Sequence, residues 1–161
     1  MSSPYRILFV CAGNIIRSPL AENLFRHLAA QAGMNGRFEA DSAGTGNWHA
    51  GESPDARMRR TASRHGLIYD GSARQVRLSD FDRYDLIVAM DTDNRSELAA
   101  RARSPEQRKK IRLLRDFDAA SGPNASVPDP YFGGDEDFEA TYRVVEAGVA
   151  GLLKSLRARK A

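Results

Sequence analysis

The sequence predicts an α/β protein, a three-layer sandwich in which a central four-stranded parallel sheet is flanked by helices on both faces. Four short apolar runs have the character of buried strands, and segments with helical spacing or helix-capping residues follow them. Strands that alternate with helices are joined by right-handed crossovers, so the strands run parallel and the helices cover both faces. At 161 residues the chain is long enough for its own core, and we expect a single domain over residues 1–161.

The first strand and helix are predicted on either side of the segment CAGNIIR. Residues 5–10 form an apolar, partly β-branched run that stops at CAGN, where glycine and asparagine indicate a turn. Ser18 is predicted to be the N-cap of the first helix and Pro19 its first residue. One face of this helix carries leucines at four-residue spacing: Leu20, Leu24 and Leu28. The order is therefore strand, loop, helix.

The second strand is predicted in the segment RFEADSAG, residues 37–44, which ends in a glycine-containing loop. This loop continues through Trp48 to Pro54. Ser53 and Pro54 are predicted to cap and begin the second helix, and Gly66 fits the left-handed residue that ends it. The order of strand, loop and helix is thus repeated.

Two further strands and the closing helix follow. Residues 84–91, YDLIVAMD, form the clearest apolar strand, residues 94–102 are predicted to be helical, and residues 110–114, KIRLL, form a weaker fourth strand. Residues 118–137 are too rich in Gly, Pro, Ser and Asn for regular structure, and such long loops are often functional. The last helix is predicted from its apolar face: Phe138, Tyr142, Val145, Val149, Leu152 and Leu156.

The charge pattern and the single cysteine narrow the class of protein. The 24 Lys and Arg residues are interleaved with 21 Asp and Glu residues, unlike the basic blocks that bind nucleic acid. The composition is that of a globular protein without a membrane span, so neither nucleic acid nor a membrane is expected as a partner. One cysteine cannot form an internal disulfide, and the N-terminal residues MSSPYRILFV lack the features of a signal peptide, so we expect a cytoplasmic protein.

The only cysteine, Cys11, lies six residues before Arg17 in the predicted loop between strand and helix. A lone cysteine is most often a small buried apolar residue, and this is the first alternative. In CAGNIIRS, however, backbone N–H groups and the positive end of the following helix can converge on a phosphate-sized anion. Arg17 can bind two oxygens of that anion, and a thiol near such positive charge ionises readily. The spacing therefore predicts a phosphate-binding loop with Cys11 as its nucleophile.

The segment VCAGNIIRSP resembles the signature of the low-molecular-weight protein tyrosine phosphatases, and DPYFGGDEDFEATY resembles the segment that carries their general acid. Between them, DSAGTGNWHAGESPDARM, HGL, ARQV and YDLIVAMD are also similar to the family, so the resemblance extends from about residue 5 to the final helix. It implies the predicted sandwich with its phosphate loop after the first strand. It also implies hydrolysis of phosphotyrosine in proteins, or of aryl phosphates, with inorganic phosphate as the product.

The resemblance implies three catalytic residues. Cys11 would attack the phosphorus and form a cysteinyl-phosphate, while Arg17 would bind the equatorial oxygens. Asp129 would protonate the leaving phenolate and later deprotonate the attacking water. The residues expected to bind phosphate are Ala12, Gly13, Asn14, Ile15, Ile16, Arg17 and Ser18. Taken alone, Asp129 is also explained as a turn residue before Pro130.

The resemblance further implies residues that support the loop and residues that line the cleft. The supporting residues, which would shape the loop and stabilise the departing thiolate, are Asn14, Ser18, Ser42 and His65. The cleft would be lined by Ile15, Trp48, Tyr131 and Phe132, and aromatic rings in this set can stack against a phenyl group. His65 has a second explanation as a histidine favoured at a helix C-terminus. Tyr131 and Phe132 have a second explanation as a hydrophobic cover for the final helix.

Two loop positions distinguish this chain from many of the proteins that it resembles. Many family members have a second cysteine directly before the arginine, where this chain has Ile16, so Cys11 lacks a partner for a protective disulfide. Relatives that act on phosphoarginine tend to have threonine where this chain has Ile15. Ile15 and Trp48 together therefore favour an aryl phosphate as substrate.

Other functions fit the sequence less well. An arsenate reductase uses a similar loop but needs further thiols, so this chain would depend on an external thiol. A binding module without activity would have little reason to combine Cys11, Arg17 and Asp129. The loop lacks the GxGxxG of dinucleotide-binding proteins, and three scattered histidines with one cysteine suggest no metal cluster. We therefore expect no cofactor and no metal, and a monomer or a weak dimer.

Overall fold

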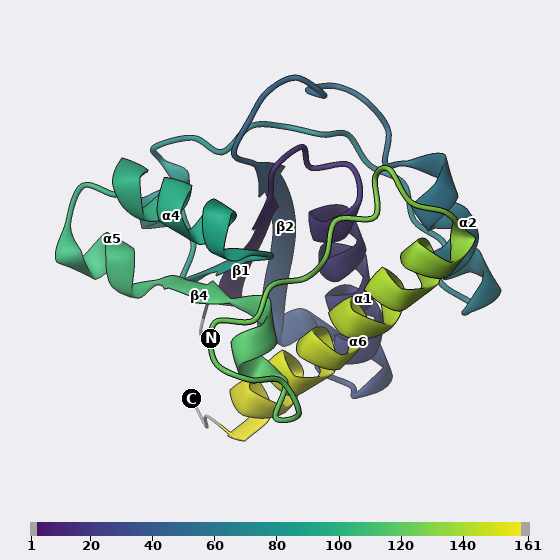
Figure 1. The fold of residues 1–161 in the computed structure, drawn as a ribbon. Coiled ribbons are helices and arrows are strands. Elements are labelled where there is room, and N and C mark those ends of the chain that lie inside the picture. Colours follow the sequence, from purple (N-terminus) through teal and green to yellow (C-terminus); the bar gives the residue numbers. More distant parts are fainter. Residues whose placement is uncertain (1–2, 159–161) are drawn as a thin grey trace.

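The computed structural model describes residues 3–158 and has a parallel sheet at its centre (Figure 1). In chain order the strands are β1 (Tyr5–Cys11), β2 (Phe38–Gly44), β3 (Leu86–Ala89) and β4 (Ile111–Leu113). Across the sheet the order is β2, β1, β3, β4, and each neighbouring pair is parallel. The predicted fold class is confirmed, and each strand overlaps the segment predicted for it.

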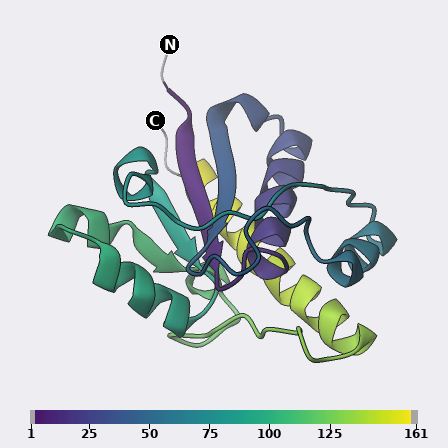
Figure 2. The ribbon, with the colours of Figure 1, turned by 90° about the horizontal axis from the view of Figure 1, so that it is seen from above.

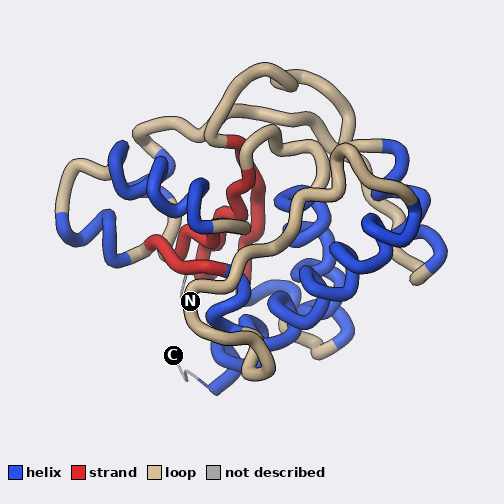
Figure 3. The backbone as a smooth tube through the Cα atoms, in the orientation of Figure 1, coloured by secondary structure: helices blue, strands red, loops and turns tan. Residues whose placement is uncertain are grey.

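Helices cover both faces of the sheet and make the outer two layers. The α-helices are α1 (Arg17–Gln31), α2 (Ala56–Arg64), α3 (Asp80–Arg83), α4 (Thr92–Arg101), α5 (Pro105–Lys109) and α6 (Asp135–Ala158), and the short 3-10 helices are η1 (Asn35–Arg37) and η2 (Leu114–Phe117). Figures 1 and 2 show α1, α2 and α6 on one side of the sheet and α4 and α5 on the other. Figure 3 shows the strands, in red, between these two groups of helices.

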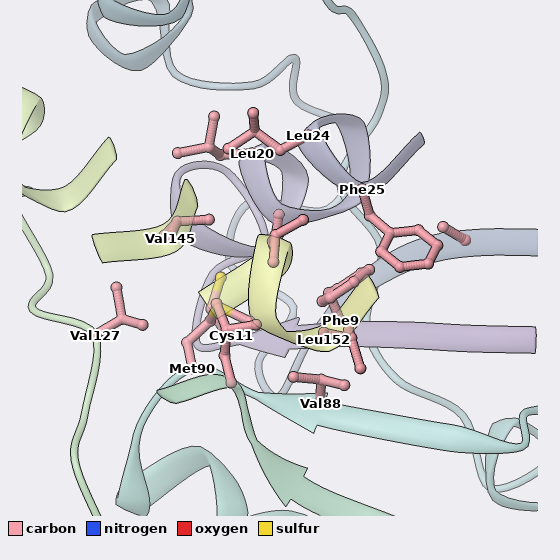
Figure 4. Close-up of a cluster of buried hydrophobic side chains, with 14 of the residues drawn as sticks. Phe9, Cys11, Leu20, Leu24, Phe25, Val88, Met90, Val127, Val145 and Leu152 are labelled. Atoms are coloured by element: carbon pink, nitrogen blue, oxygen red, sulfur yellow. The ribbon is translucent and has the colours of Figure 1, made fainter. Parts of the chain in front are cut away.

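The core is divided into two apolar clusters because successive side chains of a strand point to opposite faces of the sheet. On one face, Phe9 and Cys11 of β1 belong to a cluster with Leu24 of α1 and Leu152 of α6 (Figure 4). On the other face, the cluster includes Leu8, Val10, Ile87 and Leu98. Burying each large apolar side chain contributes about 1.5–3 kcal/mol, so the sheet is fixed from both sides. Cys11 is thus placed at the end of a rigid central strand.

Two predicted helix caps are wrong. Helix α1 begins one residue before Ser18, and its N-cap residue, Ile16, provides no side-chain hydrogen bond. Ser18 lies inside the first turn, because its hydroxyl group is engaged with Cys11 and Asn14. Helix α2 is capped by Asp55 rather than by Ser53, since the Asp55 carboxylate accepts hydrogen bonds from two backbone N–H groups of the first turn.

The closing helix and one turn residue agree with the sequence. Helix α6 begins at Asp135, a little before the predicted start, and all six residues of its predicted apolar face are buried. Gly66 after α2 has the left-handed conformation, with φ 84°. The short helices α3 and α5 were not predicted. Within the described residues, none of the helices combines the length and the apolar character that crossing a membrane requires.

Candidate active site

The candidate site lies at the carboxyl ends of the central strands, where open α/β sheets commonly bind ligands. Cys11 is the last residue of β1, and residues 12–16 connect it to α1, which begins at Arg17. Asp91 follows the end of β3 and is the N-cap residue of α4. The order strand, loop, helix therefore brings the thiol to the N-terminal end of a 15-residue helix.

Asn14 gives the loop its turn. Its φ of 59° lies in the left-handed region, which asparagine tolerates better than most residues. In this conformation the Asn14 backbone N–H group donates a hydrogen bond to Cys11 Sγ at 3.3 Å, and Ser18 Oγ lies 3.0 Å from the same sulfur atom. The loop thus wraps around the sulfur and supplies two groups that can donate hydrogen bonds to a thiolate.

The Asn14 side chain connects the loop to its surroundings. Its Nδ2 donates to Ser18 Oγ at 2.9 Å and to Ser42 Oγ at 3.0 Å, and its Oδ1 accepts from the backbone N–H of Arg74 at 2.9 Å. Ser42 Oγ in turn donates to Glu22 Oε1 at 2.6 Å. The structure therefore brings Asn14, Ser18 and Ser42 into one network, and Asn14, only 3% exposed, is its centre.

The network contains Glu22, which the sequence analysis missed, and lacks His65, which it expected. Burial raises the pKa of Glu22 above its ordinary value, although the hydrogen bond from Ser42 and the charge of Arg26 act in the opposite direction. The spacing of Glu22 four residues after Ser18, on the same helix face, was the available signal.

His65 does not join the network, contrary to the expectation. Its Nε2 lies 2.9 Å from both carboxylate oxygens of Glu139, and its ring stacks on Tyr142 with 4.1 Å between centroids. It is the C-cap residue of α2, so its position matches the alternative explanation of a histidine at a helix C-terminus. Packing of α2 against α6 pairs the imidazole with Glu139 instead of with the network around Asn14.

Arg17 is fixed by two acceptors at the ends of other segments. Its Nη1 donates to Asp91 Oδ2 at 2.8 Å and to the Val127 carbonyl oxygen at 2.9 Å. Its Nη2 lies 3.8 Å from Asp129 Oδ2. Burial alone would lower the pKa of Arg17, but the neighbouring groups, Cys11 foremost, raise it above its ordinary value. The guanidinium is therefore a permanent positive charge close to the thiol.

A cleft of about 400 Å³ opens above the loop. It is lined by Cys11, Ala12, Gly13, Ile15, Ile16, Arg17, Trp48, His49, Asp129, Tyr131 and Phe132. Cys11 is 3% exposed, whereas Trp48 is 62% and Phe132 is 98% exposed, so the sulfur lies at the closed end and aromatic rings form the rim. The exposure of Phe132 excludes its alternative role as a cover for α6. The four residues predicted to line the cleft all do so.

His49 is a second residue that the sequence analysis missed, and it lines the cleft. Its Nδ1 lies 3.1 Å from both carboxylate oxygens of Glu52, which fixes the orientation of the ring. The ring packs against Gly13 so closely that a Cβ atom there would lie 2.9 Å from His49 Cδ2. A side chain at residue 13 would therefore push the His49 ring away from the phosphate loop.

Asp129 faces Arg17 from the opposite wall of the cleft. Its Oδ1 accepts a hydrogen bond from the Tyr131 backbone N–H at 3.2 Å, and its side chain is half exposed. Tyr131 and Phe132 follow it, with their rings in an edge-to-face arrangement and 4.9 Å between centroids. A buried thiol, a fixed guanidinium and an accessible carboxyl group thus surround one space, where they can transfer a phosphoryl group and a proton.

A larger cavity of about 590 Å³ lies between α1 and β2, beside Tyr84, and belongs to a different part of the fold. Its walls contain alanine, aromatic and paired charged residues, among them Arg26, Glu39 and Arg83. None of its lining residues is a cysteine, serine or histidine, whereas the cleft above the loop combines a thiol with a buried arginine. The smaller cleft above Cys11 is therefore the better candidate for the active site.

Comparison with known proteins identifies close relatives. Residues 6–161 match the family model described as low molecular weight phosphotyrosine protein phosphatase. A low molecular weight protein-tyrosine-phosphatase of Streptomyces coelicolor is 46% identical over 154 residues, which cover 95% of this chain and 94% of that protein.

Solved structures also match over nearly the whole chain. The crystal structure of YfkJ from Bacillus subtilis has a TM-score of 0.91 and 40% identity and covers 99% of both chains. The drosophila arginine phosphatase has a TM-score of 0.87 and 32% identity and covers 96% of this chain and 99% of that one.

Proposed function

The chain belongs to the low molecular weight phosphotyrosine protein phosphatase family, and from this premise we propose that residues 1–161 form one domain that hydrolyses phosphotyrosine in proteins and small aryl phosphates. The observation that carries this proposal is the Cys11 sulfur at the closed end of a cleft that Arg17 and Asp129 also line. The products are the free phenol and inorganic phosphate.

In the first step, Cys11 Sγ attacks the phosphorus. The S–P bond forms while the bond from phosphorus to the phenolic oxygen breaks, and Asp129 transfers its proton to that oxygen. Backbone N–H groups of residues 12–17, apart from that of Asn14, and the guanidinium of Arg17 bind the three equatorial oxygens. Because Arg17 is already held by Asp91 and Val127, it needs little reorganisation when the substrate enters.

In the second step, water attacks the phosphorus of the cysteinyl-phosphate, and Asp129, now a carboxylate, accepts the proton of that water. The S–P bond breaks and the thiolate leaves. The Ser18 hydroxyl group and the Asn14 backbone N–H group lie within hydrogen-bonding distance of the sulfur and stabilise the negative charge that develops on it. Ala12, Gly13, Ile15 and Ile16 complete the loop around the phosphate.

The cleft favours an aryl phosphate over phosphoarginine. Ile15 and Trp48 present apolar surface to the entering group, and Tyr131 and Phe132 form the facing wall. A planar phenyl ring can stack between such walls, whereas a guanidinium group requires hydrogen-bond acceptors. The likeness in fold to an arginine phosphatase does not discriminate between these substrates, so the side chains of the cleft decide between them.

The enzyme acts without a metal or cofactor, because its thiol, guanidinium and carboxyl group supply all the groups that the reaction needs. We propose a cytoplasmic monomer or weak dimer with no nucleic acid or membrane partner. The single cysteine and the interleaved charges support this setting.

The test is release of phosphate from p-nitrophenyl phosphate, phosphotyrosine peptides and phosphoarginine peptides in the presence of EDTA. The wild-type protein should hydrolyse the two aryl substrates and leave phosphoarginine largely intact. The Cys11→Ser variant should lose turnover and still bind inorganic phosphate. Hydrolysis that persists in this variant, or that requires added metal, would contradict the mechanism, and preference for phosphoarginine would contradict the substrate assignment.

A further inference from the structure

The segment that carries Asp129 is fixed at its base but has few contacts at its tip. We name residues 129–133 the acid loop. Before it, Val127 is held by a hydrogen bond from its N–H group to the Met90 carbonyl oxygen, and the Pro128 carbonyl oxygen accepts from Thr141 Oγ1 at 3.3 Å. Within the loop the hydrogen bonds are local: Tyr131 N–H to Asp129, and Gly133 N–H to the Pro130 carbonyl oxygen. These contacts shape the loop but do not place it over Cys11.

Besides the ion pair between Arg17 and Asp129, Arg57 of α2 makes a contact that does. Its Nη1 donates to the Tyr131 carbonyl oxygen at 2.9 Å, which is the one hydrogen bond to the acid loop from outside it in the described part of the chain. The guanidinium carbon lies 5.3 Å from the centre of the Tyr131 ring and 4.7 Å from that of Phe138, the fourth residue of α6. The Arg57 guanidinium thus packs against Tyr131, within the acid loop, and against Phe138, which follows the loop.

Asp55 holds Arg57 in this position. Arg57 Nε lies 3.2 Å from Asp55 Oδ1, and Arg57 Nη2 lies 2.9 Å from Asp55 Oδ2, so the pair is bidentate. These hydrogen bonds raise the pKa of Arg57 above its ordinary value. The Asp55 backbone N–H group donates to the Ile15 carbonyl oxygen at 2.8 Å, so the same residue also contacts the phosphate loop.

We propose that Arg57 is a positioning residue that sets the general acid Asp129 over the nucleophile, by joining the acid loop to the phosphate loop through Asp55. This inference rests on the proposed function of Asp129 as the acid. The chain of contacts runs from Ile15 through Asp55 and Arg57 to Tyr131, and Tyr131 N–H holds the Asp129 carboxyl group. A carboxyl group must lie within hydrogen-bonding distance of the leaving oxygen, and an error of 1 Å can cost about 100-fold in rate.

The role requires arginine rather than positive charge alone. One planar guanidinium binds a carboxylate with two donors, donates to a carbonyl oxygen with a third, and stacks on aromatic rings. A lysine at this position has a single ammonium group, which cannot make all these contacts at once. Arg57→Lys therefore keeps the positive charge but should still lose most of the positioning of Asp129.

The experiment measures kcat/KM for two esters whose leaving groups differ in basicity, phenyl phosphate and p-nitrophenyl phosphate. Phenolate needs a proton as it leaves far more than p-nitrophenolate does. Arg57→Ala should lower kcat/KM for phenyl phosphate by about 10- to 100-fold and for p-nitrophenyl phosphate by clearly less. Arg60→Ala is the matched control, because Arg60 is exposed on the same helix, and it should leave both values unchanged. Thermal unfolding establishes that each variant is folded, and Arg57→Lys serves if the alanine variant is not.

A double-mutant cycle with Asp129→Ala separates positioning from a general structural effect. If Arg57 acts through Asp129, its substitution in the Asp129→Ala background should change kcat/KM by no more than about twofold. Additive losses, or an equal loss for both esters with weaker inhibition by inorganic phosphate, would overturn the proposal and indicate damage to the phosphate loop. If Asp129→Ala itself fails to increase the dependence on the leaving group, the assignment of the acid in the proposed function is what fails, and the role of Arg57 fails with it.

Discussion

Replacing Asn14 tests whether the phosphate loop depends on the backbone conformation of this residue as well as on its side chain. Asn14→Ala and Asn14→Gly both remove the hydrogen bonds to Ser18, Ser42 and the Arg74 N–H group. At about 1 kcal/mol for each bond, both variants should lose about 3 kcal/mol of unfolding free energy. Ser18 and Ser42 retain other partners, whereas the partly buried Arg74 N–H group loses its acceptor.

The two variants differ in how well residue 14 tolerates its φ of 59°. Glycine adopts this conformation freely, while alanine is strained there by about 1–2 kcal/mol, an effect that its smaller entropy in the unfolded chain only partly offsets. The alanine variant should therefore be less stable than the glycine variant by about 1 kcal/mol. With a total stability of roughly 5–15 kcal/mol, both variants should still fold.

Urea unfolding at neutral pH, followed by circular dichroism, measures these differences through the midpoint at an unchanged m-value. Equal stability of the two variants would refute the argument from backbone strain. A glycine variant as stable as the wild-type protein would refute the contribution of the hydrogen-bond network.

Three further predictions concern pH and oxidation. The pKa of Glu22 is raised in the folded protein by burial, so its ionised form costs stability at neutral pH and the cost vanishes below its ordinary pKa. The difference in unfolding free energy between Glu22→Gln and the wild-type protein should therefore be more favourable to the variant at pH 7 than at pH 4. An equal difference at both pH values would contradict this. For Asp55, burial raises the pKa, but the hydrogen bonds and charge of Arg57 prevail and lower it, so its carboxylate stabilises the fold above its ordinary pKa and less as the pH falls. The loss of stability in Asp55→Asn should accordingly shrink from pH 6 to pH 3 in thermal unfolding, and a constant loss would exclude the charge as its cause. Because Ile16 stands beside Arg17 where a second thiol would protect Cys11, peroxide-treated wild-type protein should regain less activity with dithiothreitol than the Ile16→Cys variant, with sulfinic acid at Cys11 in the mass spectrum, and equal recovery would count against this.

The features that the sequence predicted correctly are local ones. The strands β1 and β3 are continuous apolar runs because both of their faces are buried, and this pattern is visible in any short window. The turn predicted at CAGN depends on its glycine and asparagine alone, and Asn14 takes the left-handed conformation there. Cys11 and Arg17 are six residues apart, so the strand and helix that flank them are enough to bring them together. Helix α5 was not predicted, although its N-cap is also a local pattern. Ser104 precedes Pro105 and accepts a hydrogen bond from the Gln107 N–H group.

The features that only the tertiary structure decided are contacts between distant segments. Asp55 prevails over Ser53 as the cap of α2 because its N–H group also reaches the phosphate loop. His65 pairs with Glu139, and Arg57 reaches Tyr131, each across 74 residues of chain. No local pattern encodes such partners, because they depend on how α2 and α6 pack against the sheet. The sequence by itself therefore determined the order of the elements and the composition of the phosphate loop, while packing decided which side chains support the loop and which of them place the acid over it.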